Sequence, residues 1–216
     1  MKNINILITL SILFSFSLAA QNNDTKKADK HFNQLEFVDA AKNYEKLVAD
    51  GKADSYVYGR LAESYYNVFD TKKAEEYYYK ALEGNPAPDS EMVYRYAQML
   101  KANGKYNLSN QYMARFADIS PSDRRAIAFN EDPNYIPKIL ERGKKFRVEN
   151  MDINSEYSDF GGTFKDGKLY ITSARDVSGT NYGWNDEPFL DIFVSSKNSD
   201  GVYLKPEQIR GDINTS

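Results

Sequence analysis

The sequence contains no cysteine and a single histidine, His31, among its 216 residues. Without cysteine the chain has no disulfide bond, no thiolate metal site and no cysteine nucleophile. A single histidine argues against a histidine-based catalytic triad and against a zinc cage. The net charge of −3 gives no basic surface for nucleic acid. These absences predict a protein that is not an enzyme, with no catalytic residue, no metal, no cofactor and no nucleic-acid partner.

The first twenty residues have the composition of a secretory signal peptide. Lys2 supplies the positive start, residues 4–18 are mostly apolar, and small residues allow cleavage after Ala19 or Ala20. The apolar segment is short for a membrane span, which needs ~20 residues, although an uncleaved anchor is the alternative. We therefore expect an exported protein that is located in a bacterial periplasm or associated with an outer membrane.

Residues 58–86 carry small and aromatic side chains at helical spacing, followed by a proline. These positions are Tyr58, Leu61, Ala62, Tyr65, Ala74, Tyr78, Ala81 and Pro86. The pattern resembles the tetratricopeptide repeat, a helix–turn–helix unit of 34 residues. Similar residues recur 34 positions earlier and 35 positions later, so the sequence predicts three repeats over residues 21–143. Stacked repeats bury the apolar faces that a single repeat leaves open.

The predicted helices follow from this register. They span residues 24–35, 38–49, 55–67, 71–83, 90–102 and 106–117, followed by a capping helix at 122–129 and a short helix at 136–142. Asp70, Asp89 and Asn107 are placed to cap helix starts. The residues expected at helix ends, where a left-handed conformation is needed, are Gly51, Gly84 and Gly104.

The first helix of each repeat is expected to line an inner groove. Its groove positions are Asp29, Asn33, Tyr56, Glu63, Tyr66, Asn67, Tyr94, Gln98 and Lys101. The functional interpretation is a groove that binds a peptide or a partner helix. The alternative is a solvated face on a spacer. The Lys/Asn carboxylate-clamp pattern known from chaperone-tail-binding repeats is absent.

After Gly143 the apolar periodicity changes from about 3.6 to 2, which predicts strands. Residues 146–151 alternate apolar and polar side chains, and Asp166-Gly167 is typical of a type I′ hairpin turn. The four strands expected in one antiparallel sheet span residues 160–164, 168–173, 190–195 and 202–205. The fold class is therefore α+β multidomain, with a helical solenoid followed at residues 144–216 by a sheet of the size of one propeller blade.

Two further stretches resemble known β-propellers. Residues 164–175 with 191–194 are similar to the WD-repeat-like unit of TolB, and residues 153–161 with 184–191 resemble the first blade of Bacteroidetes envelope proteins. Those proteins join tetratricopeptide repeats, a propeller and an OmpA-like peptidoglycan-binding domain. The resemblance implies protein–protein contacts at the outer membrane, with envelope proteins or secretion and gliding machinery as partners. It implies peptidoglycan anchoring only through the OmpA-like domain, which these residues do not include.

A short internal repeat supports the propeller interpretation without the family. The sequence Asp152-Ile153-Asn154-Ser155 recurs 60 residues later as Asp-Ile-Asn-Thr at 212–215, where a second blade would begin. Because a propeller needs about four to eight blades, we expect the chain to be a piece of a longer protein.

A loop in the strand-rich part leaves a second candidate site. Tyr182 and Trp184 form a possible aromatic platform for a sugar or a partner, and the alternative is a loop that packs on a neighbouring blade. The carboxylates of Asp186, Glu187 and Asp191 are expected to be solvated. Taken together, the sequence predicts a non-catalytic envelope scaffold. The alternatives are a glycan- or peptide-binding module and a non-catalytic part of a propeller-bearing peptidase, although no Gly-x-Ser-x-Gly elbow is present.

Overall fold

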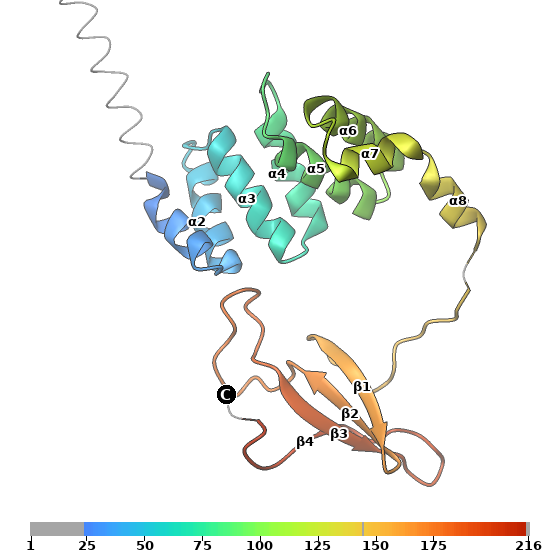
Figure 1. Ribbon diagram of the computed structural model, residues 1–216. Helices are drawn as coiled ribbons and strands as arrows, with labels where there is room; N and C mark the ends of the chain where they lie inside the picture. The colour runs from blue at the N-terminus through green and yellow to red at the C-terminus, as the bar shows by residue number, and fades with distance from the viewer. Residues whose placement is uncertain (1–23, 144, 215–216) are drawn as a thin grey trace, which may run out of the picture. The chain divides into compact units, whose positions relative to one another are not determined.

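The structure is a computed structural model that describes residues 24–143 and 145–214. The chain divides into two compact units, and the boundary in the sequence lies between residues 141 and 142. The first unit is helical and the second is built around a sheet (Figure 1). The predicted signal peptide at residues 1–20 lies outside the described residues. Within the described part, no helix has the length and apolar character that crossing a membrane requires.

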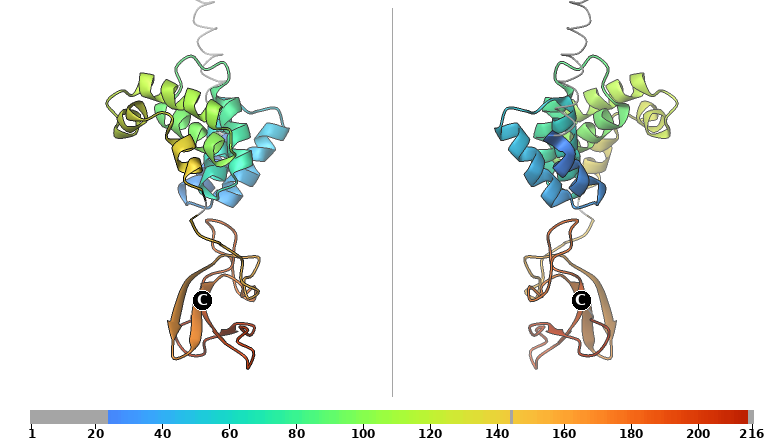
Figure 2. Two further views of the ribbon diagram at one scale, coloured as in Figure 1. Left: turned by 90° about the vertical axis from the view of Figure 1, so that its right-hand side faces the viewer. Right: turned by 90° about the vertical axis from the view of Figure 1, so that its left-hand side faces the viewer.

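The helical unit is a series of consecutive helices, viewed along the stack in Figure 2. A first helix over residues 24–33 is followed by α2 (Phe37–Ala49), α3 (Ser55–Asn67), α4 (Thr71–Leu82), α5 (Ser90–Ala102), α6 (Tyr106–Ile119), α7 (Arg124–Glu131) and α8 (Tyr135–Glu141). From α2 to α7, each helix packs against the next one along the chain. The predicted helices are thus confirmed, with ends that differ by at most two residues.

Small and large residues have different packing roles in this unit. Ala62 and Ala74 are fully buried where the paired helices approach closely, and Tyr44, Tyr78 and Met113 fill the space between helices. One continuous apolar core runs through all three repeats, from Ala28 to Ala126 (21 buried residues, which include Leu61 and Leu100). Because each repeat covers the apolar face of its neighbour, the three repeats form a single folding unit.

Most of the predicted helix caps are confirmed. The side chains of Asp70 and Asp89 accept hydrogen bonds from backbone N–H groups of α4 and α5, and the glycine after α2, Gly51, has a φ of 69°. The prediction for Asn107 was wrong: α6 begins at Tyr106, so Asn107 lies inside its first turn, and the helix start has no side-chain cap. Two unpredicted caps, Asp54 and Asp123, begin α3 and α7.

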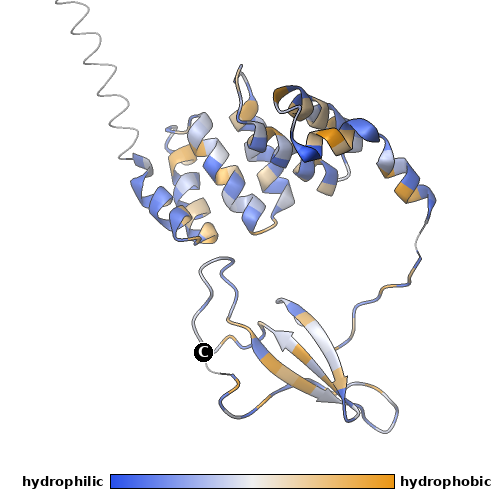
Figure 3. Cartoon of the chain, in the orientation of Figure 1, coloured by the Kyte–Doolittle hydropathy of each residue, from blue (hydrophilic) through white to orange (hydrophobic). Residues whose placement is uncertain are grey.

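The sheet unit has four antiparallel strands in sequential order. They are β1 (Asp159–Lys165), β2 (Lys168–Ser173), β3 (Asp191–Ser196) and β4 (Glu207–Gln208). The predicted hairpin turn is confirmed, because Asp166 and Gly167 both have a positive φ, at 50° and 76°. Buried and less buried side chains alternate along β2 and β3, and hydrophobic residues are drawn in orange along β3 in Figure 3. Leu169, Ile171 and Phe193 bury one face together with Ile153.

Two strand predictions were wrong. Residues 146–151 form no strand, and Phe146 and Val148 are 80% and 88% exposed, because an alternating pattern needs a neighbouring strand to bond with. The fourth strand is β4 rather than residues 202–205, where Tyr203 makes only an isolated bridge to Lys197. The register shifts by one residue between that bridge and the β3–β4 pairing. Pro206 lies at this shift and has no N–H to donate.

A polar cluster fixes the segment that precedes β1 to the sheet. The guanidinium of Arg175 donates to Asp159 at 2.7 Å, to the Ser173 hydroxyl at 2.7 Å and to the carbonyl of Ile153 at 3.1 Å. Asp159 also accepts hydrogen bonds from the backbone and hydroxyl of Ser155. These contacts hold Ile153 over the buried face of the sheet.

Candidate functional site: the inner-helix face of the repeats

The first helices of the repeats share one face of the helical unit, which we call the inner-helix face; it comprises the helix at 24–33, α3 and α5. Two hollows open on it. The central hollow, of about 410 Å³, lies between α3 and α5 and is lined by Tyr56, Glu63 and Arg95 among others. The terminal hollow, of about 420 Å³, is lined by residues of α5, α6, α7 and α8. Each hollow is large enough for a side chain of a bound segment.

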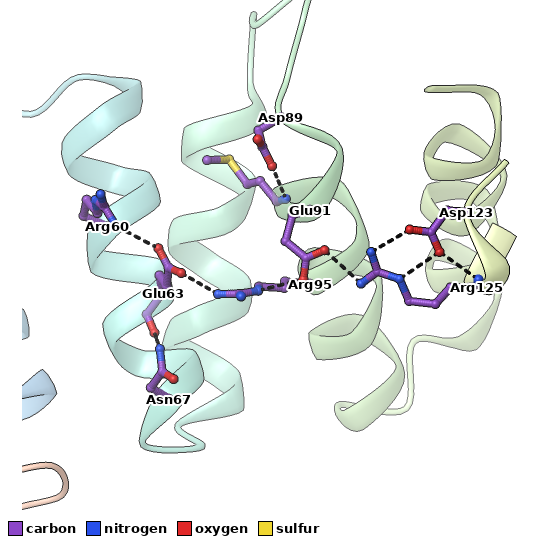
Figure 4. A network of polar contacts seen from close by, with 9 residues as sticks. Arg60, Glu63, Asn67, Asp89, Glu91, Arg95, Asp123 and Arg125 are labelled. Carbon is purple, nitrogen blue, oxygen red and sulfur yellow. Dashed lines mark hydrogen bonds and ion pairs between the residues drawn. The ribbon is translucent and has the colours of Figure 1, made fainter. Parts of the chain in front are cut away.

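A chain of ion pairs crosses this face from α3 to α7 (Figure 4). Glu63 accepts from Arg60 at 3.3 Å and from Arg95 at 2.5 Å. Glu91 accepts from Arg95 at 3.1 Å and from Arg125 at 2.8 Å. Since these side chains are 26–42% exposed, each pair contributes little to stability. Their main effect is to fix where the side chains point.

Aromatic rings lie against the same arginines. The Arg60 guanidinium lies 4.5 Å from the centre of the Phe32 ring, and that of Arg95 lies 5.0 Å from the Tyr66 ring. Arg125 lies 4.1 Å from the Tyr94 ring. Stacked rings and guanidinium groups form a surface that is apolar in its faces and polar at its edges, which suits a peptide backbone with mixed side chains.

The first helix joins the network through Asp29. Its carboxylate accepts from the Tyr44 hydroxyl at 2.5 Å and from the Tyr56 hydroxyl at 2.8 Å. Burial raises the pKa of Asp29, but hydrogen bonds from Tyr44, Thr25 and Tyr56 outweigh that effect and hold the pKa below its ordinary value. Asp29 is therefore ionised at neutral pH and serves as an internal acceptor.

The structure brings most of the predicted groove residues to this face. Tyr56 and Glu63 line the central hollow, and the three that line the terminal hollow are Tyr94, Gln98 and Lys101. Tyr66 lies under Arg95, and Asn67 donates to the carbonyl of Glu63 within α3. Asn33 is exposed in the last turn of the first helix, and it lines neither hollow.

The charged residues that organise the face were not predicted from the sequence. Arg60, Arg95, Arg125 and Glu91 were not among the predicted groove residues. A signal for two of them was present, because Arg95 follows Arg60 by 35 residues, the spacing that separates the second and third repeats. Arg125 lies on the capping helix, outside the repeat register, and no repeat signal marks it.

The predicted loop platform is only half formed. Tyr182 lines a hollow of about 460 Å³ in the sheet unit with Phe160, Phe189 and Leu190, and its ring centre lies 5.7 Å from that of Phe189. Trp184 is half-buried and is not among the lining residues. Asp191 was expected to be solvated, but it is 4% exposed at the start of β3 and accepts from Gln208.

One group of possible metal ligands occurs among the described residues. His31, Glu36 and Asp39 place ligand atoms within 4.8 Å of one another, and the His31 Nδ1 lies 2.6 Å from a Glu36 carboxylate oxygen. A histidine–carboxylate hydrogen bond accounts for this contact, and Asp39 is exposed. The His31 ring is half-buried.

Comparison with known proteins finds a structural likeness for part of the chain. No family model matches the sequence, and no curated protein matches it. One similar solved structure is the second TPR domain of the human RPAP3 protein, determined by NMR in complex with the HSP70 peptide SGPTIEEVD. It is 21% identical, covers 51% of this chain and 92% of its own, and has a TM-score of 0.43. The helix pairs and their spacing of 34 and 35 residues identify tetratricopeptide-like repeats in the chain.

Proposed function

We propose that the protein is a non-catalytic interaction protein whose inner-helix face binds an extended segment of a partner protein. The observation that carries this proposal is the pair of hollows side by side on one face, framed by tyrosine and arginine side chains. These residue types are enriched among the residues that dominate binding energy at protein interfaces. Tyr56 is 47% exposed at the rim of the central hollow, where a partner side chain would bury it.

We further propose that the protein is exported to the cell envelope and that the sheet unit is the first blade of a propeller. The signal-peptide composition of the first twenty residues supports export to the periplasm or the outer membrane. The four antiparallel strands and their type I′ turn support a first propeller blade, and the sequence repeat at 212–215 supports a second. In this proposal the protein is an envelope scaffold for outer-membrane, secretion or gliding machinery, and an OmpA-like domain outside these residues supplies peptidoglycan binding.

A second candidate, glycan binding by the sheet unit, has one observation in its favour. The rings of Tyr182 and Phe189 lie 5.7 Å apart, centre to centre, at a hollow that Phe160 and Leu190 also line. Aromatic faces pack well against the apolar side of a sugar ring. A peptidase role would need a nucleophile that this chain does not present in an elbow motif.

Two exposed tyrosines give a matched test of the proposed face. Tyr56 on α3 is 47% exposed and donates to Asp29, whereas Tyr79 on α4 is 48% exposed and donates to Glu83. We expect Tyr56→Ala to reduce capture of a discrete protein from envelope extracts by the full chain at least tenfold, and Tyr79→Ala to leave it unchanged. Circular dichroism checks that both variants stay helical. Equal capture by all three proteins would contradict the proposal.

A further inference from the structure

One internal contact is made in the outer repeats and is missing in the middle one. In the first repeat the buried Tyr44 hydroxyl donates to Asp29 at 2.5 Å. In the third repeat, Gln98 on the inner helix donates to the sulfur of Met113 at 3.7 Å. The spacings of 34 and 35 residues make Glu63 and Tyr78 the equivalent pair in the middle repeat.

Glu63 does not bond to Tyr78, because two arginines hold it elsewhere. One of its carboxylate oxygens accepts from Arg95 at 2.5 Å and the other accepts from Arg60 at 3.3 Å. Tyr78 is 2% exposed, and within the described part of the chain its hydroxyl is the one buried side-chain oxygen or nitrogen without a hydrogen-bond partner. A buried hydroxyl without a partner is unfavourable, so this position favours an external partner.

The space for such a partner is present beside Tyr78. Tyr78 lines the central hollow together with Gly59 and Met92. A Cβ atom on Gly59 would lie 2.8 Å from the Met92 Cε, so a side chain here would push Met92 aside. The glycine therefore lets α3 and Met92 approach closely and leaves the hollow open.

The charges around the hollow decide which group fits. Burial raises the pKa of Tyr78 more than the neighbouring Arg95 guanidinium lowers it, so the phenol stays protonated. Arg95 can only donate to the phenol oxygen, so the O–H group remains available as a donor. The lining residues carry two guanidinium groups and three carboxylates, on Arg60, Arg95, Glu63, Asp89 and Glu91. A further carboxylate would face three like charges. A neutral amide avoids this repulsion because it carries no charge. Its carbonyl can accept from the hydroxyl, and its N–H₂ group can donate to a carboxylate.

We propose that the central hollow is a subsite for the side-chain amide of a glutamine or asparagine in an extended partner segment, with the Tyr78 hydroxyl as the donor to its carbonyl. This inference rests on the proposed binding role of the inner-helix face. It gives a specific function to a buried hydroxyl that folding alone leaves without a partner.

The test uses a small amide probe and the full chain. N-acetylglutamine N-methylamide is titrated into ¹⁵N-labelled protein, with N-acetylglutamate N-methylamide as the charged control. We expect saturable shifts of α3 and α5 amides with the glutamine probe and at least tenfold weaker binding of the glutamate probe. Tyr78→Phe should weaken binding of the glutamine probe at least tenfold. The melting temperature of this variant should equal or exceed that of the wild-type protein.

A second variant guards against an indirect effect of Tyr78→Phe. Gly59→Ala retains the helix and displaces Met92 at the wall of the hollow, so it should also weaken binding of the glutamine probe. Unsaturable shifts, tighter binding of the glutamate probe, or unchanged binding by Tyr78→Phe would each overturn the subsite. These failures are distinct from failure of the binding face itself, which is judged by partner capture with Tyr56→Ala and Tyr79→Ala.

Discussion

The helical unit and the sheet unit bury their apolar residues in different ways. In the helical unit each repeat covers the next, and the core is continuous through three repeats. In the sheet unit four residues, Ile153 among them, form a small core on one face. The other face has Phe160 at 53% exposure and half-buried Ile192 and Val194. Each repeat therefore covers the apolar face of its neighbour, whereas one apolar face of the sheet stays partly exposed.

This difference bears on function. A stack with a continuous core can fix exposed side chains at defined positions, as the ion pairs from Arg60 to Arg125 do on the inner-helix face. A single sheet whose core has four buried residues removes little apolar area from water, so burial stabilises it less than it stabilises the repeats. We therefore place partner recognition on the repeats and expect the sheet to gain stability by packing against further structure.

The largest expected effect comes from removing core side chains in the two units separately. Leu61 in α3 is 0% exposed and Leu169 in β2 is 3% exposed. Each Leu→Ala change should cost about 2–5 kcal/mol in its own unit. Leu61→Ala should lower the melting midpoint of the helical signal. Leu169→Ala should abolish the folded fluorescence of Trp184, the single tryptophan, and leave that midpoint unchanged. A shared midpoint would contradict the separation of the units.

The next effect concerns acid sensitivity of the sheet unit. Burial raises the pKa of Asp159, but hydrogen bonds from Ser173, Arg175 and Ser155 outweigh it and lower the pKa to about 2 from 3.8. A lowered pKa in the folded state gives stability that is present above about pH 4 and lost as the pH falls towards 2. The contribution is about 2 kcal/mol.

Urea unfolding followed by Trp184 fluorescence between pH 2 and 6 checks this contribution. The wild-type sheet unit should lose stability on acidification, and Asp159→Asn should be less stable at pH 6 and nearly independent of pH in this range. The helical signal serves as the internal control. An acid dependence that Asp159→Asn leaves intact would contradict the assignment to this carboxylate.

A smaller difference in stability is expected between variants of the equivalent tyrosines in the first and middle repeats. Tyr44→Phe removes a hydroxyl that donates to Asp29 and should cost about 1 kcal/mol. Tyr78→Phe removes a hydroxyl that has no partner, so it should cost nothing measurable or add stability. Thermal unfolding of the two variants in parallel measures the difference, and an equal loss in both would show that Tyr78 does have a partner in the free protein.

The smallest effect is expected on the outer surface of the repeats. Glu76 and Lys80 form an ion pair of 2.7 Å within α4, with side-chain exposures of 55% and 37%. Such pairs contribute about 0.3–0.5 kcal/mol. Glu76→Gln should therefore shift the helical midpoint by about a degree and should not change partner capture. A loss of capture would move the binding surface to α4.

The repeat spacing predicted the helices because the 34- and 35-residue periods specify which small residues must face each other. The same periods place Tyr56 and Glu63 on the inner-helix face. They do not specify side-chain partners: Asp29 and Glu63 are equivalent in the repeat, yet Asp29 bonds to Tyr44 and Glu63 bonds to arginines. That outcome depends on Arg95, which reaches across from the neighbouring repeat.

The strand predictions succeeded where a turn fixed the register. Asp166-Gly167 sets the pairing of β1 with β2, and both strands lie within one residue of their predicted ends. At residues 202–205 the alternating pattern gave no information on the register shift at Pro206. Alternation alone at 146–151 could not reveal whether a neighbouring strand is available.

The central claim is that α3 and α5 form the partner-binding face. Hydrogen exchange of the full chain, with and without the partner recovered by Tyr56-dependent capture, tests it most directly. We predict slower exchange in α3 and α5 on binding and unchanged exchange in α4 and α6. Slower exchange confined to α4, α6 or the sheet unit, with α3 and α5 unchanged, would contradict the account.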